Sequence, residues 1–220
     1  MAKIFFTSDL HFSHKNIAKF CPVFRPATNH IEELDEFMIA RWNETVSPED
    51  VVYNLGDVSF AREFRQVESV LYRLNGTHHL IYGNHDQEIR QHIERLKNTP
   101  KHDRLPMLSS AQDYLKMKLS KINNTLILFH YPIHEWDGCH KGWYHLYGHL
   151  HDRMAKVPGR LLNVGYDLHG RFLIPQDIEE FLARLPKVAH HDEAAITVKS
   201  KDLKDAKEEI WAELLRLNYH

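Results

Sequence analysis

The sequence has few cysteines, little net charge and no apolar run long enough to cross a membrane. Cys21 and Cys139 are the only cysteines in 220 residues, so we expect two idle thiols in a reducing compartment, the cytoplasm. Neither a secretory signal peptide nor a membrane-spanning stretch is recognisable, which argues against a membrane partner. With 28 basic and 30 acidic residues, the net charge of −2 provides no field for holding duplex nucleic acid.

The chain also lacks internal repeats and low-complexity segments, and its 43% apolar content suffices for one sizeable core. We expect a single domain over residues 1–186. A polar stretch follows, and residues 202–217 then place five apolar side chains on one face of a helix. Residues 187–220 are therefore predicted to be a polar linker and a helix that packs on the domain or forms the contact of a homodimer.

The first half of the chain alternates buried-type strands with helices. Residues 3–8, 51–55 and 79–82 are apolar runs without polar alternation, which is typical of strands covered on both faces. Helical spacing follows each run, most clearly over residues 29–46 and 64–74. Three such units in succession predict right-handed crossovers and parallel strands.

The second half has a different pattern. Alternation over residues 114–119, the turn at Asn123-Asn124 and the run 125–129 predict a hairpin. Strands over 144–147 and 161–164 follow with no helix between them, so we expect this half to be mainly antiparallel. Together, the patterns of the two halves predict a mixed α/β fold. We expect a four-layer α/β/β/α sandwich of two mixed sheets flanked by helices, with a C-terminal helical appendage.

Histidine is abundant, at 18 residues, and not every one can have a chemical role. Seven lie in polar contexts away from strand ends, and we expect these at the surface: His78, His79, His92, His102, His190, His191 and His220.

Five polar clusters stand in order along the chain, most of them directly after an apolar run. They are Asp9-Leu10-His11, Gly56-Asp57, Gly83-Asn84-His85-Asp86, His130, and Gly148-His149-Leu150-His151. Carboxylate, imidazole and amide groups suit Mn, Fe, Zn, Ni or Mg, and no thiolate is among them. On an extended backbone, residues two apart such as Asp9 and His11 point the same way and can hold one ion. The pattern indicates a two-metal hydrolase.

Each cluster alone has an ordinary structural explanation. Asp57 can cap a helix, residues 83–86 can form a turn with solvent-facing side chains, and His130 can bond to backbone. All these explanations would have to hold at once, in this order and at these strand ends. We therefore favour the metal site.

The five clusters resemble the blocks of the calcineurin-like metallophosphoesterase superfamily, which run Asp-x-His, Gly-Asp, Gly-Asn-His-Asp/Glu, His and Gly-His-x-His. The resemblance covers residues 4 to about 175. Around the blocks, residues 7–17, Trp42-Asn43 and residues 129–133 are similar to small stand-alone phosphoesterases of bacteria and their phages. In the Ser/Thr protein phosphatases an Asp-Arg pair follows Gly-Asp, whereas here Val58-Ser59-Phe60-Ala61-Arg62 follows and Arg62 is displaced, which argues against a protein phosphatase.

The resemblance implies a dinuclear phosphoesterase with two divalent ions, manganese being favoured over iron, zinc, nickel or magnesium. It implies that Asp9, His11, Asp57 and His151 hold one ion, and that Asp57, Asn84, His130 and His149 hold the other. A hydroxide that bridges the two ions would attack phosphorus, and His85 would stabilise or protonate the leaving oxygen. Asp86 would either fix the tautomer of His85 or cap the helix that follows.

Three further residues are candidates for substrate contact: His14, Arg25 and Trp136, the last by stacking on a base. Their alternatives are a surface histidine, a loop salt bridge and a packing anchor, respectively.

We expect metal-dependent hydrolysis of a small phosphodiester or phosphomonoester, with a nucleotide-type substrate favoured. One alternative is a nuclease acting on short single-stranded nucleic acid, against which stands the lack of a basic stripe with interleaved aromatics. The other is a non-catalytic metal-binding scaffold of the same fold.

Overall fold

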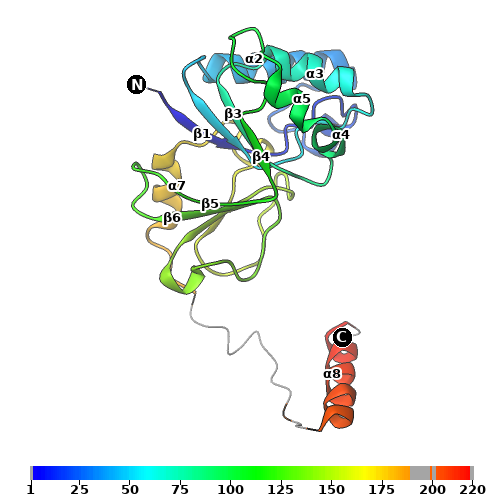
Figure 1. Ribbon diagram of the computed structural model, residues 1–220, viewed down its shortest axis with the longest axis vertical. Helices are drawn as coiled ribbons and strands as arrows, with labels where there is room; N and C mark the ends of the chain where they lie inside the picture. The colour runs from blue at the N-terminus through cyan, green and yellow to red at the C-terminus, as the bar shows by residue number, and fades with distance from the viewer. Residues whose placement is uncertain (1, 189–198, 200–201, 219–220) are drawn as a thin grey trace. The chain divides into compact units, whose positions relative to one another are not determined.

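The computed structural model describes residues 2–188, 199 and 202–218 (Figure 1). The chain divides into two units, Met1–Lys187 and Val188–His220, and each is described by itself. Most of the predicted polar linker lies outside the described residues, as do His190, His191 and His220.

The first sheet has four parallel strands in the order β1-β2-β3-β4. They are β1 (Ile4–Thr7), β2 (Val51–Asn54), β3 (Thr77–Ile81) and β4 (Ser110–Gln112). The helices between them are α1 (Ile17–Phe20), α2 (Ile31–Thr45), α3 (Phe64–Arg73), α4 (Gln87–Gln91) and α5 (Ile93–Asn98). The strand–helix alternation and parallel pairing predicted for this half are confirmed.

The second sheet has the order β5-β6-β7-β8. Its strands are β5 (Tyr114–Lys118), β6 (Thr125–Phe129), β7 (Tyr144–Tyr147) and β8 (Leu161–Asn163). The β5–β6 hairpin is antiparallel as predicted, but β6–β7 and β7–β8 are parallel, so the expectation of a mainly antiparallel half is wrong. The reason is that the irregular segments 130–143 and 148–160 return the chain to the starting end of the sheet without an α-helix. Three short helical elements and one long helix complete the described chain: η1 (Cys139–Lys141), α6 (Tyr166–His169) and α7 (Pro175–Leu182) are short, and α8 (Leu203–Asn218) has 16 residues.

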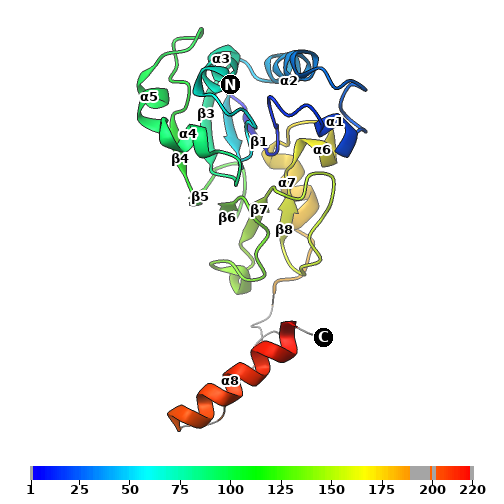
Figure 2. The ribbon, with the colours of Figure 1, turned by 90° about the vertical axis from the view of Figure 1, so that its right-hand side faces the viewer.

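Alternation along the first sheet divides its side chains between two cores. Phe5, Val52 and Leu80 pack with residues of α2 and α3. Phe6 and Ile81, one residue further along, pack instead against the second sheet. Helices α2 and α3 thus cover one face of the first sheet, and the second sheet covers the other (Figures 1 and 2). The predicted α/β sandwich of two sheets flanked by helices is confirmed.

The outer face of the second sheet is covered by the segment 131–143. Trp136 is buried there, its indole N–H donates to the Trp143 carbonyl at 2.8 Å, and its ring lies 5.5 Å from that of His145. Trp136 is therefore a packing anchor, the alternative that the sequence left open, and we assign it no substrate contact.

One histidine expected at the surface is fully buried. His78 lies on β3 two residues before Leu80, so its side chain points to the same helix-covered face, and its ring centroid is 4.9 Å from that of Trp42. Its polar sequence neighbours concealed this position.

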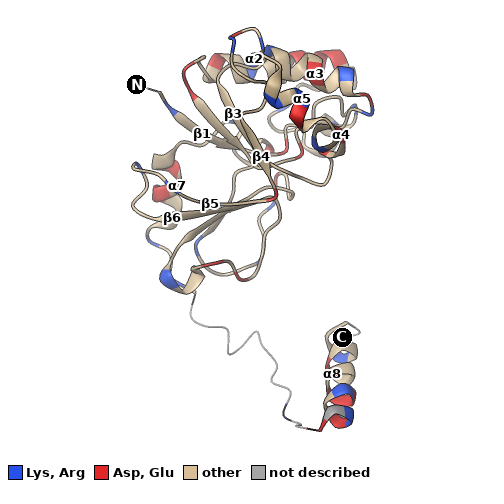
Figure 3. Cartoon of the chain, in the orientation of Figure 1, with Lys and Arg blue, Asp and Glu red and all other residues tan. Residues whose placement is uncertain are grey.

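Acidic residues outnumber basic ones on α2, whereas α3 and α5 carry residues of both signs (Figure 3). None of the helices in the described part of the chain is both long and apolar enough to span a membrane.

Candidate metal centre

The polar clusters meet because the strands that precede them run parallel. Asp9, Asp57 and Asn84 follow β1, β2 and β3 and leave the same edge of the first sheet. His130 and His149 follow β6 and β7, whose parallel pairing brings them out at one edge of the second sheet. Without that unpredicted parallel pairing, the two histidines would lie at opposite ends of their sheet.

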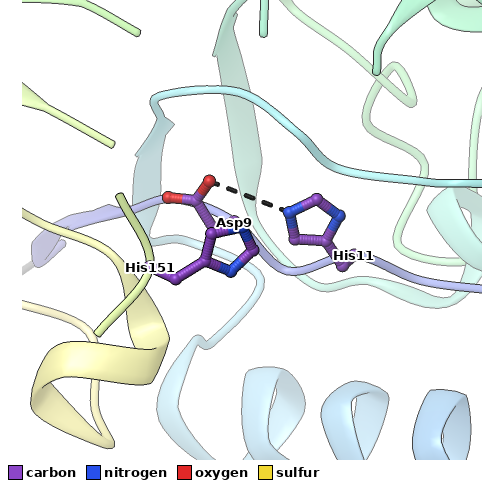
Figure 4. Close-up of side chains that lie close together, drawn as sticks. All are labelled: Asp9, His11 and His151. Carbon is purple, nitrogen blue, oxygen red and sulfur yellow. Dashed lines mark ion pairs between the residues drawn. The ribbon is translucent and has the colours of Figure 1, made fainter. Parts of the chain in front are cut away.

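Asp9, His11 and His151 form the first candidate metal-binding group (Figure 4). One donor atom of each lies within 4.8 Å of the others. His11 Nε2 is 3.8 Å from Asp9 Oδ1, and the rings of His11 and His151 stack with centroids 4.7 Å apart.

Asp57, His130 and His149 form the second group, within the same distance limit. His130 Nδ1 lies 2.6 Å from the carbonyl oxygen of Leu55, so this nitrogen carries the proton and donates it. Nε2 is thereby left as an acceptor that faces the group, 3.5 Å from Asp57 Oδ2 and 3.2 Å from Asn84 Oδ1. Asn84 thus adjoins this group through its amide oxygen.

Asp57 lies between the two groups. Its Oδ2 is 3.5 Å from His130 Nε2 and 3.8 Å from His11 Nε2, while Oδ1 accepts the backbone N–H of His85 at 2.8 Å. Burial opposes the charge of this carboxylate, but when His130 carries a second proton, on Nε2, it donates to Asp57, and this bond together with the charges of His130 and His11 outweighs burial and lowers the pKa of Asp57 to about 2. An ionised carboxylate therefore faces both groups at once.

The unsatisfied atoms of the site fit a metal ion. Both ring nitrogens of His11 are buried, and neither has a hydrogen-bond partner within the described residues. Buried polar atoms without partners are costly, and a coordinated cation would satisfy one of them. The carboxylate, imidazole and amide donors around it suit Mn, Fe, Zn, Ni or Mg.

Left-handed backbone is concentrated at these residues. Among the described non-glycine residues, seven have positive φ, and five of them are candidate ligands: Asp9 (58°), His11 (52°), Asp57 (54°), His149 (66°) and His151 (53°). The Asp-x-His and His-x-His pairs are therefore not aligned by an extended backbone, and that prediction is wrong. The ligands converge from tight loops in a conformation that side chains rarely adopt, and such conformations persist mainly at functional sites.

Two glycines of the clusters are required because side chains of the site lie too close to them to leave room for a Cβ atom. A Cβ atom on Gly83 would lie 2.2 Å from Asp57 Oδ1, and one on Gly148 would lie 1.9 Å from the Ser8 hydroxyl oxygen and 2.7 Å from Asp9 Oδ2. Any larger residue at either position would displace a candidate ligand.

Asp167 supports the first group and is not among the site residues predicted from the sequence. Its Oδ2 lies 3.2 Å from His151 Nδ1, which orients the imidazole. Burial opposes the imidazolium, but Asp167, Cys21 and Asp9 together raise the pKa of His151 to about 10. A local signal was present, because Gly165 and Asp167 follow β8, which runs parallel to the strand that precedes His149.

Arg25 is the buried partner of Asp167. Its Nε lies 2.6 Å from Asp167 Oδ1, and its guanidinium also donates to the carbonyls of Leu10 and Asp9 at 3.0 and 2.9 Å. The structure thus shows the salt bridge that was the alternative to a substrate contact. Arg25 fixes the backbone of the first cluster, and we assign it no contact with substrate.

His14 lies at the rim of the site, with its ring 5.7 Å from that of His11. The backbone N–H of Asn16 donates to His14 Nδ1 at 3.2 Å, so the proton of the neutral ring is on Nε2. Burial and the neighbouring His11 lower the pKa of His14, which keeps this ring neutral at pH 7.

The ring of His85 lies 5.7 Å from that of His11, and burial lowers its pKa. Asp86 does not bond to His85 in the described structure. Its carboxylate accepts the backbone N–H groups of Gly83, Asp57 and Val58 at 2.7 to 2.9 Å, which ties the second cluster to the third. Asp86 occupies the N-cap position of α4 without a side-chain capping bond, and burial raises its pKa to about 6.

Comparison with known proteins finds similar proteins in phages and in an archaeon. It is 31% identical to the Gene 66 protein of Mycobacterium phage D29 over 199 residues, which cover 80% of this chain and 94% of that protein. The chain belongs to the Gene 66 protein family. No protein-family model matches it.

Other similarities are partial or concern the fold. The uncharacterized protein MJ1445 of Methanocaldococcus jannaschii is 41% identical over 88 residues, but the matched part spans only 48% of its length and 40% of this chain. The protein of unknown function AQ665 from Aquifex aeolicus shares the fold, with a TM-score of 0.59 and 17% identity over 83% of this chain and all of its own. A structure described as a novel archaeal phosphodiesterase aligns with 74% of this chain and 83% of its own at a TM-score of 0.42, a likeness too weak to carry an argument.

Proposed function

We propose that this Gene 66 family protein is a phosphoester hydrolase with a dinuclear metal centre, manganese being the favoured ion. The observation that carries the proposal is the position of Asp57, an ionised and buried carboxylate whose Oδ2 faces both candidate ligand groups. Two cations held close together repel each other, and a shared carboxylate between them reduces that repulsion.

Each group would hold one ion. Asp9, His11, Asp57 and His151 would hold the first ion, and Asp57, Asn84, His130 and His149 would hold the second. When bound, such ions lower the pKa of water and neutralise charge on a phosphoryl group. The protein supplies a fixed set of donors, because Arg25 and Asp86 hold the loops that carry them through buried hydrogen bonds.

His85 is the proposed contact for the leaving oxygen. It is half-buried at the edge of the ligand set, and its backbone N–H is fixed on Asp57 Oδ1. Its lowered pKa makes the ring neutral at pH 7, so it stabilises the leaving oxygen by donating an N–H hydrogen bond. His14, with its proton on Nε2, is a second donor at the same rim.

A small ester suits the surface better than a polymer. A cavity of about 540 Å³ is lined by His11, His85 and His151, a volume typical of small-molecule sites. Helix α2 is mainly acidic and α3 and α5 carry charges of both signs, so these helices have no continuous basic stripe for a nucleic-acid backbone (Figure 3). We therefore favour a small nucleotide-type ester over a nucleic acid strand.

The test is hydrolysis of bis(p-nitrophenyl) phosphate and p-nitrophenyl phosphate by metal-stripped protein titrated with Mn²⁺. Activity that appears with metal and is lost in Asp57→Asn supports the proposal, and the preferred ester distinguishes a diesterase from a monoesterase. His92→Gln, a change on α4–α5 away from the ligands, is the matched control that should retain activity. Metal binding without hydrolysis of any phosphate ester would favour a scaffold and contradict the proposal.

A further inference from the structure

Two exposed aromatic residues beside the candidate metal centre have no part in the described core. Phe60 is 38% exposed and Phe20 is 62% exposed. Phe60 lies three residues after Asp57, and its backbone N–H donates to the carbonyl of Phe12 at 2.7 Å, which fixes the loop that carries it. Large apolar side chains held at the surface beside a polar site are typical of binding surfaces.

These residues belong to a continuous series of rings, which we call the aromatic row: Phe20, His14, Phe60 and His85. Successive ring centroids are 6.0, 4.3 and 4.4 Å apart. The row ends at the candidate ligands, because the ring of His85 is 5.7 Å from that of His11. A molecule that reaches the ligands through this side of the site must therefore pass along aromatic surface.

The aromatic row forms one wall of the cavity of about 540 Å³, which His11, His151 and Arg153 also line. His14 and Phe60 also line a second cavity of about 500 Å³, which contains Lys15 and Arg62. The two cavities thus share the middle of the row. The candidate metal ligands lie at one end of this surface, and the aromatic rings extend away from them.

We propose that the aromatic row binds the base of a nucleoside phosphate whose phosphoryl group lies at the candidate metal centre. This inference rests on the proposed function and specifies its substrate class. A nucleobase has a planar π face that stacks on aromatic side chains, whereas a sugar phosphate or an alkyl ester has none. Phe60 is the specificity-determining residue, because it joins the two cavities and contacts both His14 and His85.

The matched ligands are adenosine 5′-monophosphate and ribose 5-phosphate, which differ only by the base. Each is tested as a competitive inhibitor of metal-dependent hydrolysis of methyl p-nitrophenyl phosphate, and its binding to the Mn²⁺-loaded protein is measured by calorimetry. We expect the nucleotide to bind at least about tenfold more tightly, the factor that stacking of one base provides.

Two variants and one control assign the preference to the row. Phe60→Ala should reduce the ratio of the two inhibition constants to about twofold or less, and Phe60→Trp should keep it. The ratio compares binding and not turnover, so a lower rate in Phe60→Ala does not by itself alter it. Phe181→Ala is the control, since Phe181 is 48% exposed and lies on α7, and the ratio should be unchanged in it.

Equal inhibition by the two ligands in the wild type would overturn the inference while leaving the proposed function intact. A preference that survives in both Phe60→Ala and Phe20→Ala would also overturn it. If no ester is hydrolysed, the proposed function fails. Calorimetry then decides the inference separately, because tighter binding of the nucleotide that is lost in Phe60→Ala would still support a base-binding row.

Discussion

Asp57 and His85 are adjacent in the site but are expected to have separable roles. Asp57 faces both ligand groups, whereas the His85 ring only borders them. Asp57→Asn should therefore abolish turnover and sharply weaken metal retention. His85→Ala should lower turnover by about 10²- to 10⁴-fold with metal content unchanged, because it removes a hydrogen-bond donor and no ligand.

Initial rates and metal content after gel filtration measure both effects on the same samples. Wild-type turnover in His85→Ala would show that the role assigned to this histidine is wrong. Full metal content in Asp57→Asn would show that Asp57 is not shared by the two groups.

His78 provides a pH-dependent test of the fold that is independent of the site. It is fully buried, neither ring nitrogen has a partner in the described structure, and burial lowers its pKa to about 3. The unfolded chain binds this proton near pH 6.5, so the stability that neutral His78 contributes is present above pH 6.5 and is lost as the pH falls toward 3.

The loss should approach about 1.4 kcal/mol per pH unit within that window. Urea unfolding at pH 6.5, 5.5 and 4.5 should therefore show a shallower decline for His78→Leu than for the wild type. His30→Gln removes an exposed histidine and should leave the wild-type slope unchanged. An identical slope in His78→Leu would contradict the burial of a neutral imidazole at this position.

At the scale of elements, the strands and most helices of the first unit were predictable because their periodicity is local. The apolar runs at 3–8, 51–55 and 79–82 became β1, β2 and β3, and the helical spacing over 29–46 became α2, Ile31–Thr45. The direction of β7 was not predictable. It depends on where the irregular segment 130–143 returns the chain, and no periodicity encodes that path.

The candidate site was likewise predictable where its residues have a local sequence pattern, and not predictable where their role depends on tertiary contacts. All seven predicted ligands lie in or beside the two groups that the structure brings together, because strand-end clusters carry a local signature. Arg25 and Trp136 had the chemistry of substrate contacts, but their burial in tertiary contacts gives them structural roles. Phe60 had no motif of its own, and only its position between His14 and His85 singles it out.

At the scale of the whole molecule, the candidate site is contained in the first unit. All seven ligands, His85 and the aromatic row lie within Met1–Lys187. Deletion of residues 188–220 should therefore leave metal-dependent hydrolysis within about twofold of the full chain. A loss of more than about tenfold, with the fold intact by circular dichroism, would contradict this containment.

The same deletion tests the role predicted for the second unit. The helix expected over 202–217 is confirmed as α8, Leu203–Asn218, and its Ile210 and Leu214 are each 46% exposed. A dimer contact through α8 predicts that light scattering shows a dimer for the full chain and a monomer after deletion. If the full chain and the shortened chain form particles with the same number of subunits, α8 does not form a dimer contact. Packing on the domain would then remain as the predicted role of α8.

The central claim is that two adjacent ions share Asp57, and metal stoichiometry combined with electron paramagnetic resonance tests it most directly. Metal-stripped protein titrated with Mn²⁺ should bind two ions per chain and give the spectrum of an exchange-coupled pair. Asp57→Asn should lose the coupling. One ion per chain, or two ions with uncoupled spectra, would contradict the dinuclear centre.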